Sequence, residues 1–148
     1  MNTVMLALST FRQSEAAVRL AIERARESDR LLIVFVVDVN LARYFIGTDV
    51  GFYPDLMKIT EREMLARHAN DAEDRVVAIA GKARAEGIAT ETRVKTGRFA
   101  LVCLEIAGEV KPREIVTTRS ERPKWVRRFF GSPVDDLIAR AGCPVREA

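Results

Sequence analysis

The 148-residue sequence has little of the chemistry that marks metal sites, disulfides or membrane spans. It contains two cysteines, Cys103 and Cys143, and a single histidine, His68. The cysteines have no paired spacing and no histidine cluster beside them, so neither a zinc site nor a disulfide framework is expected. No apolar run approaches the roughly 20 residues that cross a bilayer, and residues 1–11 lack the pattern of a secretory signal. We therefore expect a cytoplasmic protein.

The length and the charge of the chain indicate how many domains it forms and what kind of ligand it could attract. A chain of this length is expected to form one domain over residues 1–148 and to bury roughly two thirds of its unfolded surface. The formal net charge is +3, and the excess is concentrated between residues 119 and 130, where Glu121 is the single acidic residue. The basic residues of this segment are Arg119, Arg122, Lys124, Arg127 and Arg128. Such a patch attracts phosphorylated ligands, but a solvated loop that only aids solubility explains it equally well.

Short apolar runs alternate along the chain with segments of helical periodicity. The runs at 4–8 and 31–37 are typical of central parallel strands that are buried on both faces. Further strands are expected at 90–94, at 114–118 and from 144 onward, and helices at 14–28, 55–86, 99–109 and 132–141. This alternation predicts the α/β class: a single doubly wound domain, with about four helices on the two faces of a five-stranded sheet.

The start of the last expected helix carries the most specific local pattern. Ser132 suits the N-cap and Pro133 suits the first helical position, while Asp135 completes a capping pattern. The unpaired N–H groups and the dipole at such a start favour a phosphate or carboxylate, and Gly131 would let an anion approach the backbone closely. A helix that is merely well capped is the simpler interpretation.

No catalytic constellation emerges from the remaining residues. His68 lies at the edge of the apolar stripe of the long helix, where a surface or half-packed histidine is a better interpretation than a catalytic base. Cys103 falls inside a helix and is expected to be a small buried apolar residue. No nucleophile and base pair or carboxylate dyad can be assembled, so we expect no enzymatic role, with weak ATP hydrolysis left open.

Over essentially its whole length the chain resembles the universal stress protein (UspA-like) family. The similarity lies in the opening VMLALSTFRQSEAAVRLAIERA, the ending Val36-Val37-Asp38 of the second strand, and the later segments GRFA, IVTTRS and GSPVDDLIARAGCPV. The resemblance implies a parallel sheet in the order 3-2-1-4-5. It places ligands at the carboxyl ends of the strands, beside the switch between strands 1 and 4.

The resemblance also implies a nucleotide site, although its motif is incomplete here. The ATP-binding branch of the family carries Gly-x-x-Gly, nine residues, and then Gly followed by Ser or Thr. Gly131 and Ser132 match the end of this motif, whereas Thr118 and Glu121 replace its early glycines. Ser9 stands where the family often has an aspartate, and a hydroxyl is a weaker hydrogen-bonding group than a carboxylate.

The nucleotide-binding residues that the resemblance implies are Ser9, Val36, Arg119, Gly131 and Ser132. Val36 stands where the family contacts adenine. Arg119 and the amides at the helix start would hold the phosphates of AMP, ATP or another anion. The first function hypothesis is therefore a stress-response sensor that binds an adenine nucleotide.

A degenerate family member without nucleotide binding is the second hypothesis, in which the chain acts as a dimerisation or protein-docking module for a regulatory partner. The family implies a homodimer through the last strand, although the charges that follow Cys143 discourage edge pairing. Aromatic residues between the arginines, including Trp125 and Phe129, could stack on nucleic-acid bases or insert at a membrane surface. A short helix that packs these aromatics on the core is the better interpretation, so neither partner is expected.

Overall fold

A single parallel β-sheet forms the centre of the molecule. The computed structural model describes residues 2–10, 12–38, 54–119 and 133–148. In this part of the chain the strand order is β3-β2-β1-β4-β5, and every neighbouring pair is parallel. The strands are β1 (Thr3–Ser9), β2 (Arg30–Asp38), β3 (Thr90–Gly97), β4 (Glu114–Thr117) and β5 (Val145–Glu147). The predicted five-stranded sheet and its order are confirmed.

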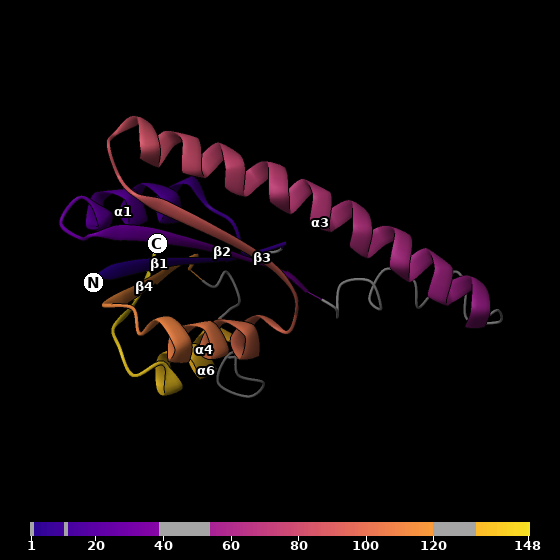
Figure 1. The fold of residues 1–148 in the computed structure, drawn as a ribbon. Coiled ribbons are helices and arrows are strands. Elements are labelled where there is room, and N and C mark those ends of the chain that lie inside the picture. Colours follow the sequence, from indigo (N-terminus) through magenta and orange to yellow (C-terminus); the bar gives the residue numbers. More distant parts are fainter. Residues whose placement is uncertain (1, 11, 39–53, 120–132) are drawn as a thin grey trace.

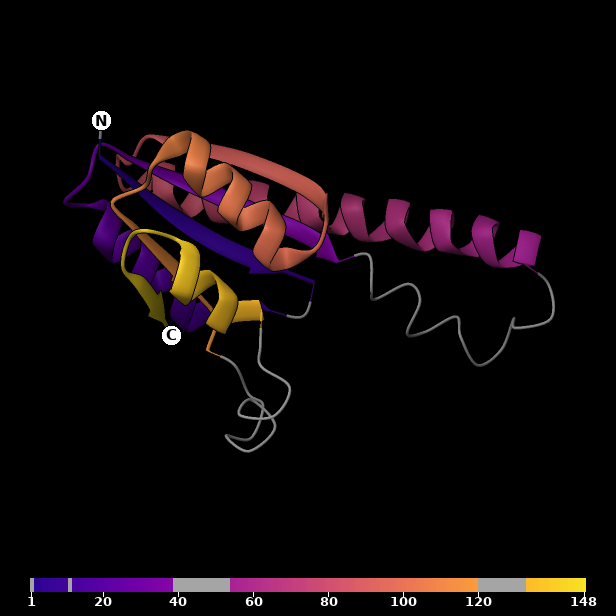
Figure 2. The same cartoon turned by 90° about the horizontal axis from the view of Figure 1, so that it is seen from below.

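The four described helices cover both faces of the sheet (Figure 1). One layer consists of α1 (Glu15–Ala25) and α3 (Pro54–Ala85), and the other consists of α4 (Phe99–Val110) and α6 (Pro133–Arg140). Seen from below, α4 and α6 lie side by side, and the end of α3 near Pro54 projects well beyond the sheet (Figure 2). This arrangement confirms the predicted doubly wound α/β fold.

The central strands are buried on both faces because alternate side chains of a strand point in opposite directions. In β1, Leu6 belongs to the hydrophobic cluster beneath α1 and α3, whereas its neighbour Met5 belongs to the cluster beneath α4 and α6. In β2, Phe35 and Val36 divide in the same way. The continuous apolar runs that predicted these two strands therefore supply both cores.

Edge strand β3 is longer than the sequence predicted. It extends to Gly97 rather than ending near residue 94, and it pairs with β2 in register up to the pair Asp38 and Gly97. The polar side chains at its end obscured this extension, since backbone pairing with β2 does not require apolar residues. Gly97 also sits close to α4, where an added Cβ would lie 2.8 Å from Val102 Cγ2.

Local signals set the helix ends as predicted. Ser14 is the N-cap of α1, and its side chain accepts a hydrogen bond of 3.1 Å from the Ala17 N–H. Gly87 follows α3 and Gly142 follows α6, and both have positive φ angles, 79° and 70°, which glycine adopts without steric cost. Lys111 ends α4 in a left-handed conformation that the sequence did not predict.

A buried carboxylate lies at the amino end of β4. Glu114 is only 3% exposed, and it receives hydrogen bonds from Arg24 Nε at 2.6 Å and Arg24 Nη2 at 2.8 Å. Arg146 Nε and Arg113 Nε approach the same carboxylate at 3.5 Å and 3.9 Å. The hydrogen bond from Arg24 is the main reason that the pKa of Glu114 is lowered. Glu114 thereby joins α1, β4 and β5.

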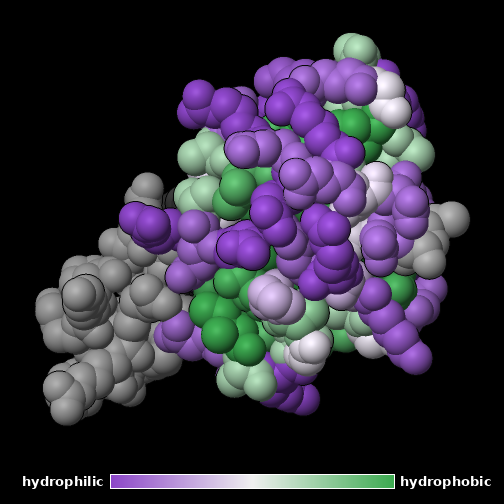
Figure 3. Space-filling view, turned by 90° about the vertical axis from the view of Figure 1, so that its left-hand side faces the viewer, coloured by the Kyte–Doolittle hydropathy of each residue, from purple (hydrophilic) through white to green (hydrophobic). Residues whose placement is uncertain are grey.

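Hydrophobic side chains that remain on the surface are scattered. The large exposed ones in the described part of the chain are Val77 on α3, Leu101 on α4 and Ile138 on α6. The face in Figure 3 is mostly hydrophilic, with hydrophobic residues in small separate groups. Isolated exposure of this kind is ordinary for a globular domain. Among the described helices, none combines the length and the hydrophobicity that a membrane crossing requires.

Candidate functional site

The carboxyl ends of β1 and β2 bring two of the predicted site residues together. Ser9 pairs in register with Val36. Ser9 is 2% exposed and Val36 is fully buried, so neither side chain reaches the surface. The backbone turns sharply after β1, where the Ser9 N–H donates to the Arg12 carbonyl and the Arg12 N–H donates to the Ser9 carbonyl. Any ligand at this point would therefore meet backbone atoms of the strand ends rather than these two side chains.

Residues that follow β4 meet the start of α1 on the other side of β1. Ser14 Oγ lies 3.3 Å from Thr118 Oγ1 and 3.2 Å from the Ala148 carbonyl oxygen, to which it donates. The Arg119 N–H donates to the same carbonyl at 2.9 Å, and the Arg119 side chain is exposed. Since β1 connects to β2 on one side and pairs with β4 on the other, this is the topological switch point of the sheet, where doubly wound proteins bind ligands.

Two of the predicted site residues, Gly131 and Ser132, lie outside the described residues. The segment from 120 to 132 also contains most of the predicted basic patch. α6 begins at Pro133, the predicted first helical position, with Asp135 and Asp136 in its first turn. We use the name switch-point site for Ser9, Val36, Arg119, Gly131 and Ser132.

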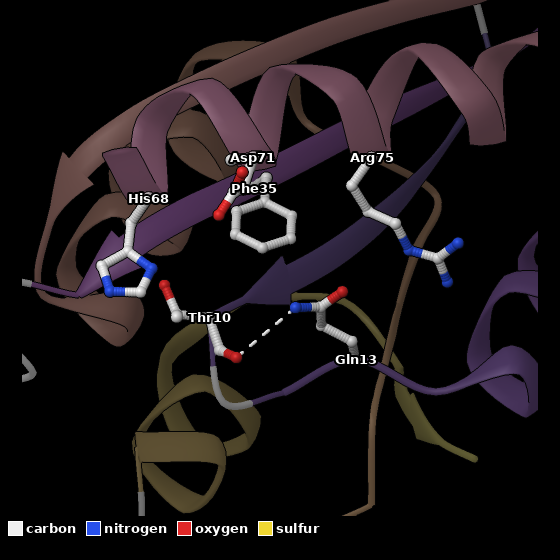
Figure 4. Close-up of a pocket in the computed structure, with 7 residues that line it drawn as sticks. Thr10, Gln13, Phe35, His68, Asp71 and Arg75 are labelled. Carbon is white, nitrogen blue, oxygen red and sulfur yellow. Dashed lines mark hydrogen bonds between the residues drawn. The ribbon is translucent and has the colours of Figure 1, made fainter. Parts of the chain in front are cut away.

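A pocket of about 250 Å³ opens next to this site, beneath α3 (Figure 4). We call it the α3 pocket. Its lining residues are Thr10, Gln13, Phe35, His68, Asp71, Ala72 and Arg75. In the close-up, the ring of Phe35 forms the back wall, α3 supplies one side, and the segment between β1 and α1 supplies the other. No switch-point residue from the described part of the chain is among these seven, but Thr10 follows Ser9 directly and Phe35 precedes Val36.

Polar groups dominate the α3 pocket. Thr10 Oγ1 has no contact with solvent and no hydrogen-bond partner among the described residues, and it points toward the His68 ring in Figure 4. The Gln13 amide donates to the Thr10 carbonyl over 3.4 Å, which is a long hydrogen bond. Arg75 Nη2 donates to Glu15 Oε1 at 2.8 Å, and this contact lowers the pKa of Glu15. The pocket is thus lined by polar side chains on both its sides, although the Thr10 hydroxyl itself does not reach solvent.

The α3 pocket was not predictable from the sequence. His68, Asp71 and Arg75 follow one another at spacings of three and four, which places them on one face of a helix. That spacing was a usable signal, but it does not reveal that the segment after β1 packs opposite this face. From the sequence alone, His68 is therefore only a residue at the edge of the apolar stripe.

Metal and thiol chemistry receive no support from the described residues. No group of three or more histidine, cysteine, aspartate or glutamate side chains within them could hold a metal ion. Cys103 is fully buried in α4, and burial raises the pKa of its thiol to about 12. A thiol with so high a pKa is protonated and unreactive at neutral pH. The prediction that Cys103 is a small buried apolar residue is confirmed.

The strand order defines a doubly wound α/β protein whose topological switch point lies between β1 and β4. The sequence profile of the universal stress protein family matches residues 1–146, so the chain belongs to that family. Among curated proteins, none matches the sequence.

Several solved structures share the fold. The universal stress protein UspA of Lactobacillus plantarum superimposes with a TM-score of 0.72 and 18% identity, over 97% of this chain and 94% of the other. A universal stress protein in complex with cAMP gives a TM-score of 0.57 and 18% identity, over 99% of this chain and 95% of the other. A family member from Arabidopsis thaliana with AMP bound gives a TM-score of 0.51 and 20% identity, over 99% of this chain and 90% of the other.

Proposed function

We propose that the chain is a stress-response or regulatory protein that binds an adenine nucleotide, AMP or ATP, at the carboxyl ends of β1 and β4. The observation that carries this proposal is the switch point, where Ser14 and Thr118 bring the segments after β1 and β4 together. Family members of the same fold contain cAMP or AMP, which supports an adenine nucleotide as the ligand class. No catalytic role is included, because no nucleophile and base pair is present at the described strand ends.

Different switch-point residues would contact different parts of the nucleotide. Ser9 and Val36 have buried side chains, so they would lie beneath the base and sugar and shape the strand ends there. Arg119, whose side chain is exposed, would pair with phosphate, and Gly131 with Ser132 would contribute helix-start amides. The proposed protein is thus a sensor whose bound state depends on the nucleotide concentration.

Titration calorimetry with AMP, ADP and ATP tests the nucleotide proposal. We expect saturable binding of at least one of them, and we expect Arg119→Ala to weaken it about tenfold through the loss of a charged hydrogen bond to phosphate. Arg19→Ala is the matched control, because Arg19 is an exposed arginine on α1 outside the site. Absence of heat at millimolar concentrations of all three nucleotides would contradict the proposal.

A second candidate is a docking or dimerisation module without a nucleotide. Two observations favour it: the Ser14 and Thr118 hydroxyls already bond within the protein, and the Ser9 hydroxyl is buried. Here the chain would form a homodimer through β5, the edge strand next to β4, and would present a surface to a regulatory protein.

Sedimentation equilibrium tests the homodimer. The expected mass is twice the 16.6 kDa of one chain. β5 has only three residues and Arg146 and Glu147 are charged, so we expect a weak dimer whose mass falls toward one chain on dilution. A measured mass equal to that of one chain at every concentration up to the millimolar range would rule out the dimer.

A further inference from the structure

We propose that the free edge of β3 binds the same edge of a second copy of this chain, with the two strands antiparallel about a two-fold axis at Thr92. In the described sheet β3 is the outermost strand on the side opposite β5 (Figure 1). The inference therefore concerns a different surface from that of the β5 dimer, and it does not depend on nucleotide binding.

The backbone groups of β3 alternate between β2 and the free edge. The carbonyl of Ala89, just before β3, accepts a hydrogen bond from the Leu31 N–H of β2 at 2.8 Å, so the backbone of Ala89 faces β2. Successive residues of a strand direct their N–H and C=O groups to opposite sides. Thr90, Thr92 and Val94 therefore direct theirs away from β2, where another strand can bond to them.

This edge is long and regular. β3 has eight residues, whereas β5 has three. Its register with β2 is continuous from Thr90 to Gly97, and its sequence contains no proline. The Thr90 carbonyl accepts a hydrogen bond from Arg84 Nη2 at 3.1 Å, and a carbonyl can accept a second one. Short length, bulges, proline and charge all discourage edge pairing, and of these four β3 has charge alone.

The charged side chains of β3 share the face of the sheet that α4 covers. Arg93 Nη1 pairs with Glu109 Oε2 of α4 at 3.3 Å, and Arg93 Nε pairs with Glu91 Oε1 at 3.2 Å. Lys95 lies two residues further on and so falls on the same face. Val94 packs instead against the cluster beneath α1 and α3. Charges of both signs on one face make pairing with another strand depend on the register.

One antiparallel register matches these charges with a second copy. With the axis at Thr92, Glu91 of each chain lies opposite Arg93 of the other, in the non-hydrogen-bonded pairs whose side chains are closest. The two-fold axis produces this opposite-charge pair twice. An axis at Val94 would place Arg93 opposite Lys95, and an axis at Arg93 would place that residue opposite its own copy. The order of charges along β3 is thus self-complementary, which favours a second copy over an unrelated strand.

The test exchanges the charges and measures mass by sedimentation equilibrium. Glu91→Lys and Arg93→Glu, each alone, are expected to dimerise about tenfold more weakly than the wild type, because both attractive pairs become repulsive. An equimolar mixture of the two variants restores opposite charges in both pairs, so it is expected to dimerise as well as the wild type. Glu23→Lys and Arg19→Glu are matched controls, since both residues are exposed on α1, away from β3.

Thr92→Pro tests the backbone contribution separately. Proline removes the outward N–H, and an edge strand tolerates it where that N–H faces away from the sheet. We expect this variant to keep the circular dichroism of the wild type and to dimerise more weakly, whereas Thr92→Ser keeps the N–H and should dimerise normally. Dimerisation of Thr92→Pro at the wild-type strength would overturn the inference.

The remaining outcomes separate the two edges of the sheet. A wild type with the mass of one chain at every concentration up to the millimolar range overturns both the β3 interface and the β5 dimer, and it leaves the nucleotide proposal standing. If the charge variants dimerise as well as the wild type, the association belongs to β5 and the inference fails. If they dimerise weakly and the mixture does not recover, the proposed register is overturned.

Discussion

Glu114→Gln is expected to lower the free energy of unfolding by about 3 kcal/mol, near the lower end of the range for a broken buried ion pair. The carboxylate is buried and accepts two hydrogen bonds from Arg24, while Arg113 and Arg146 stand within 4 Å. A neutral amide removes the negative charge that the Arg24, Arg113 and Arg146 guanidinium groups share. The loss stays moderate because the arginine side chains are about a third to a half exposed and keep part of their hydration.

Urea unfolding at several pH values measures this effect. The pKa of Glu114 is lowered from its ordinary value of 4.5 in the folded state, so its charged form contributes stability above that value and loses it as the pH falls through the folded-state pKa. The difference between the wild type and Glu114→Gln should be full at pH 7 and should shrink below about pH 4. A difference that is independent of pH would contradict the electrostatic explanation.

A matched control for this prediction is Glu91→Gln. Glu91 also contacts two arginines, Arg30 at 2.7 Å and Arg93 at 3.2 Å, but its side chain is 40% exposed. Exposed ion pairs contribute at most about 1 kcal/mol, so this variant should lose far less stability. Equal losses in the two variants would show that burial does not set the energy.

Leu6→Ala is expected to cost about 3 kcal/mol of unfolding free energy, because it removes buried methyl groups and leaves a cavity. Leu6 has no exposed surface and lies on the central strand between Ile33 of β2 and Val116 of β4. All three belong to the cluster beneath α1 and α3. Neighbouring strands on both sides hold the backbone in place, so the cavity cannot close by local collapse.

Chemical denaturation of Leu6→Ala and Leu101→Ala side by side checks this second prediction. Leu101 is 54% exposed on α4, so the same substitution there should change the free energy by no more than about 0.5 kcal/mol. A small loss for Leu6→Ala would mean that β1 can move to refill the space. That result would contradict the rigid central position of this strand.

The fold was largely predictable because its strongest signals are local. The apolar runs of β1 and β2 are continuous, and Ser14, Gly87 and Gly142 mark helix ends through capping and backbone freedom. The family resemblance supplied the strand order. β3 was predicted too short because its end pairs with β2 through backbone hydrogen bonds. Such pairing does not require apolar side chains, so the hydrophobic pattern does not indicate it.

The candidate site was predictable only in part. Ser9 and Val36 could be placed at strand ends, and in the structure the two residues pair in register. The burial of the Ser9 side chain and the α3 pocket could not be predicted, since both depend on how segments far apart in sequence pack together. Glu114 illustrates the same limit: its partners Arg24 and Arg146 lie at opposite ends of the chain.

The position of β1 between β2 and β4 has a consequence for assembly. Near the carboxyl end of β1, Ala7 pairs with Val34 of β2 on one side and with Thr117 of β4 on the other, so this edge of the sheet joins a strand from early in the chain to a strand from late in it. The switch point is complete only once β4 has docked onto β1. A molecule bound there would favour the complete sheet over any form that lacks β4, and through mass action its abundance would set how much of the chain persists fully assembled.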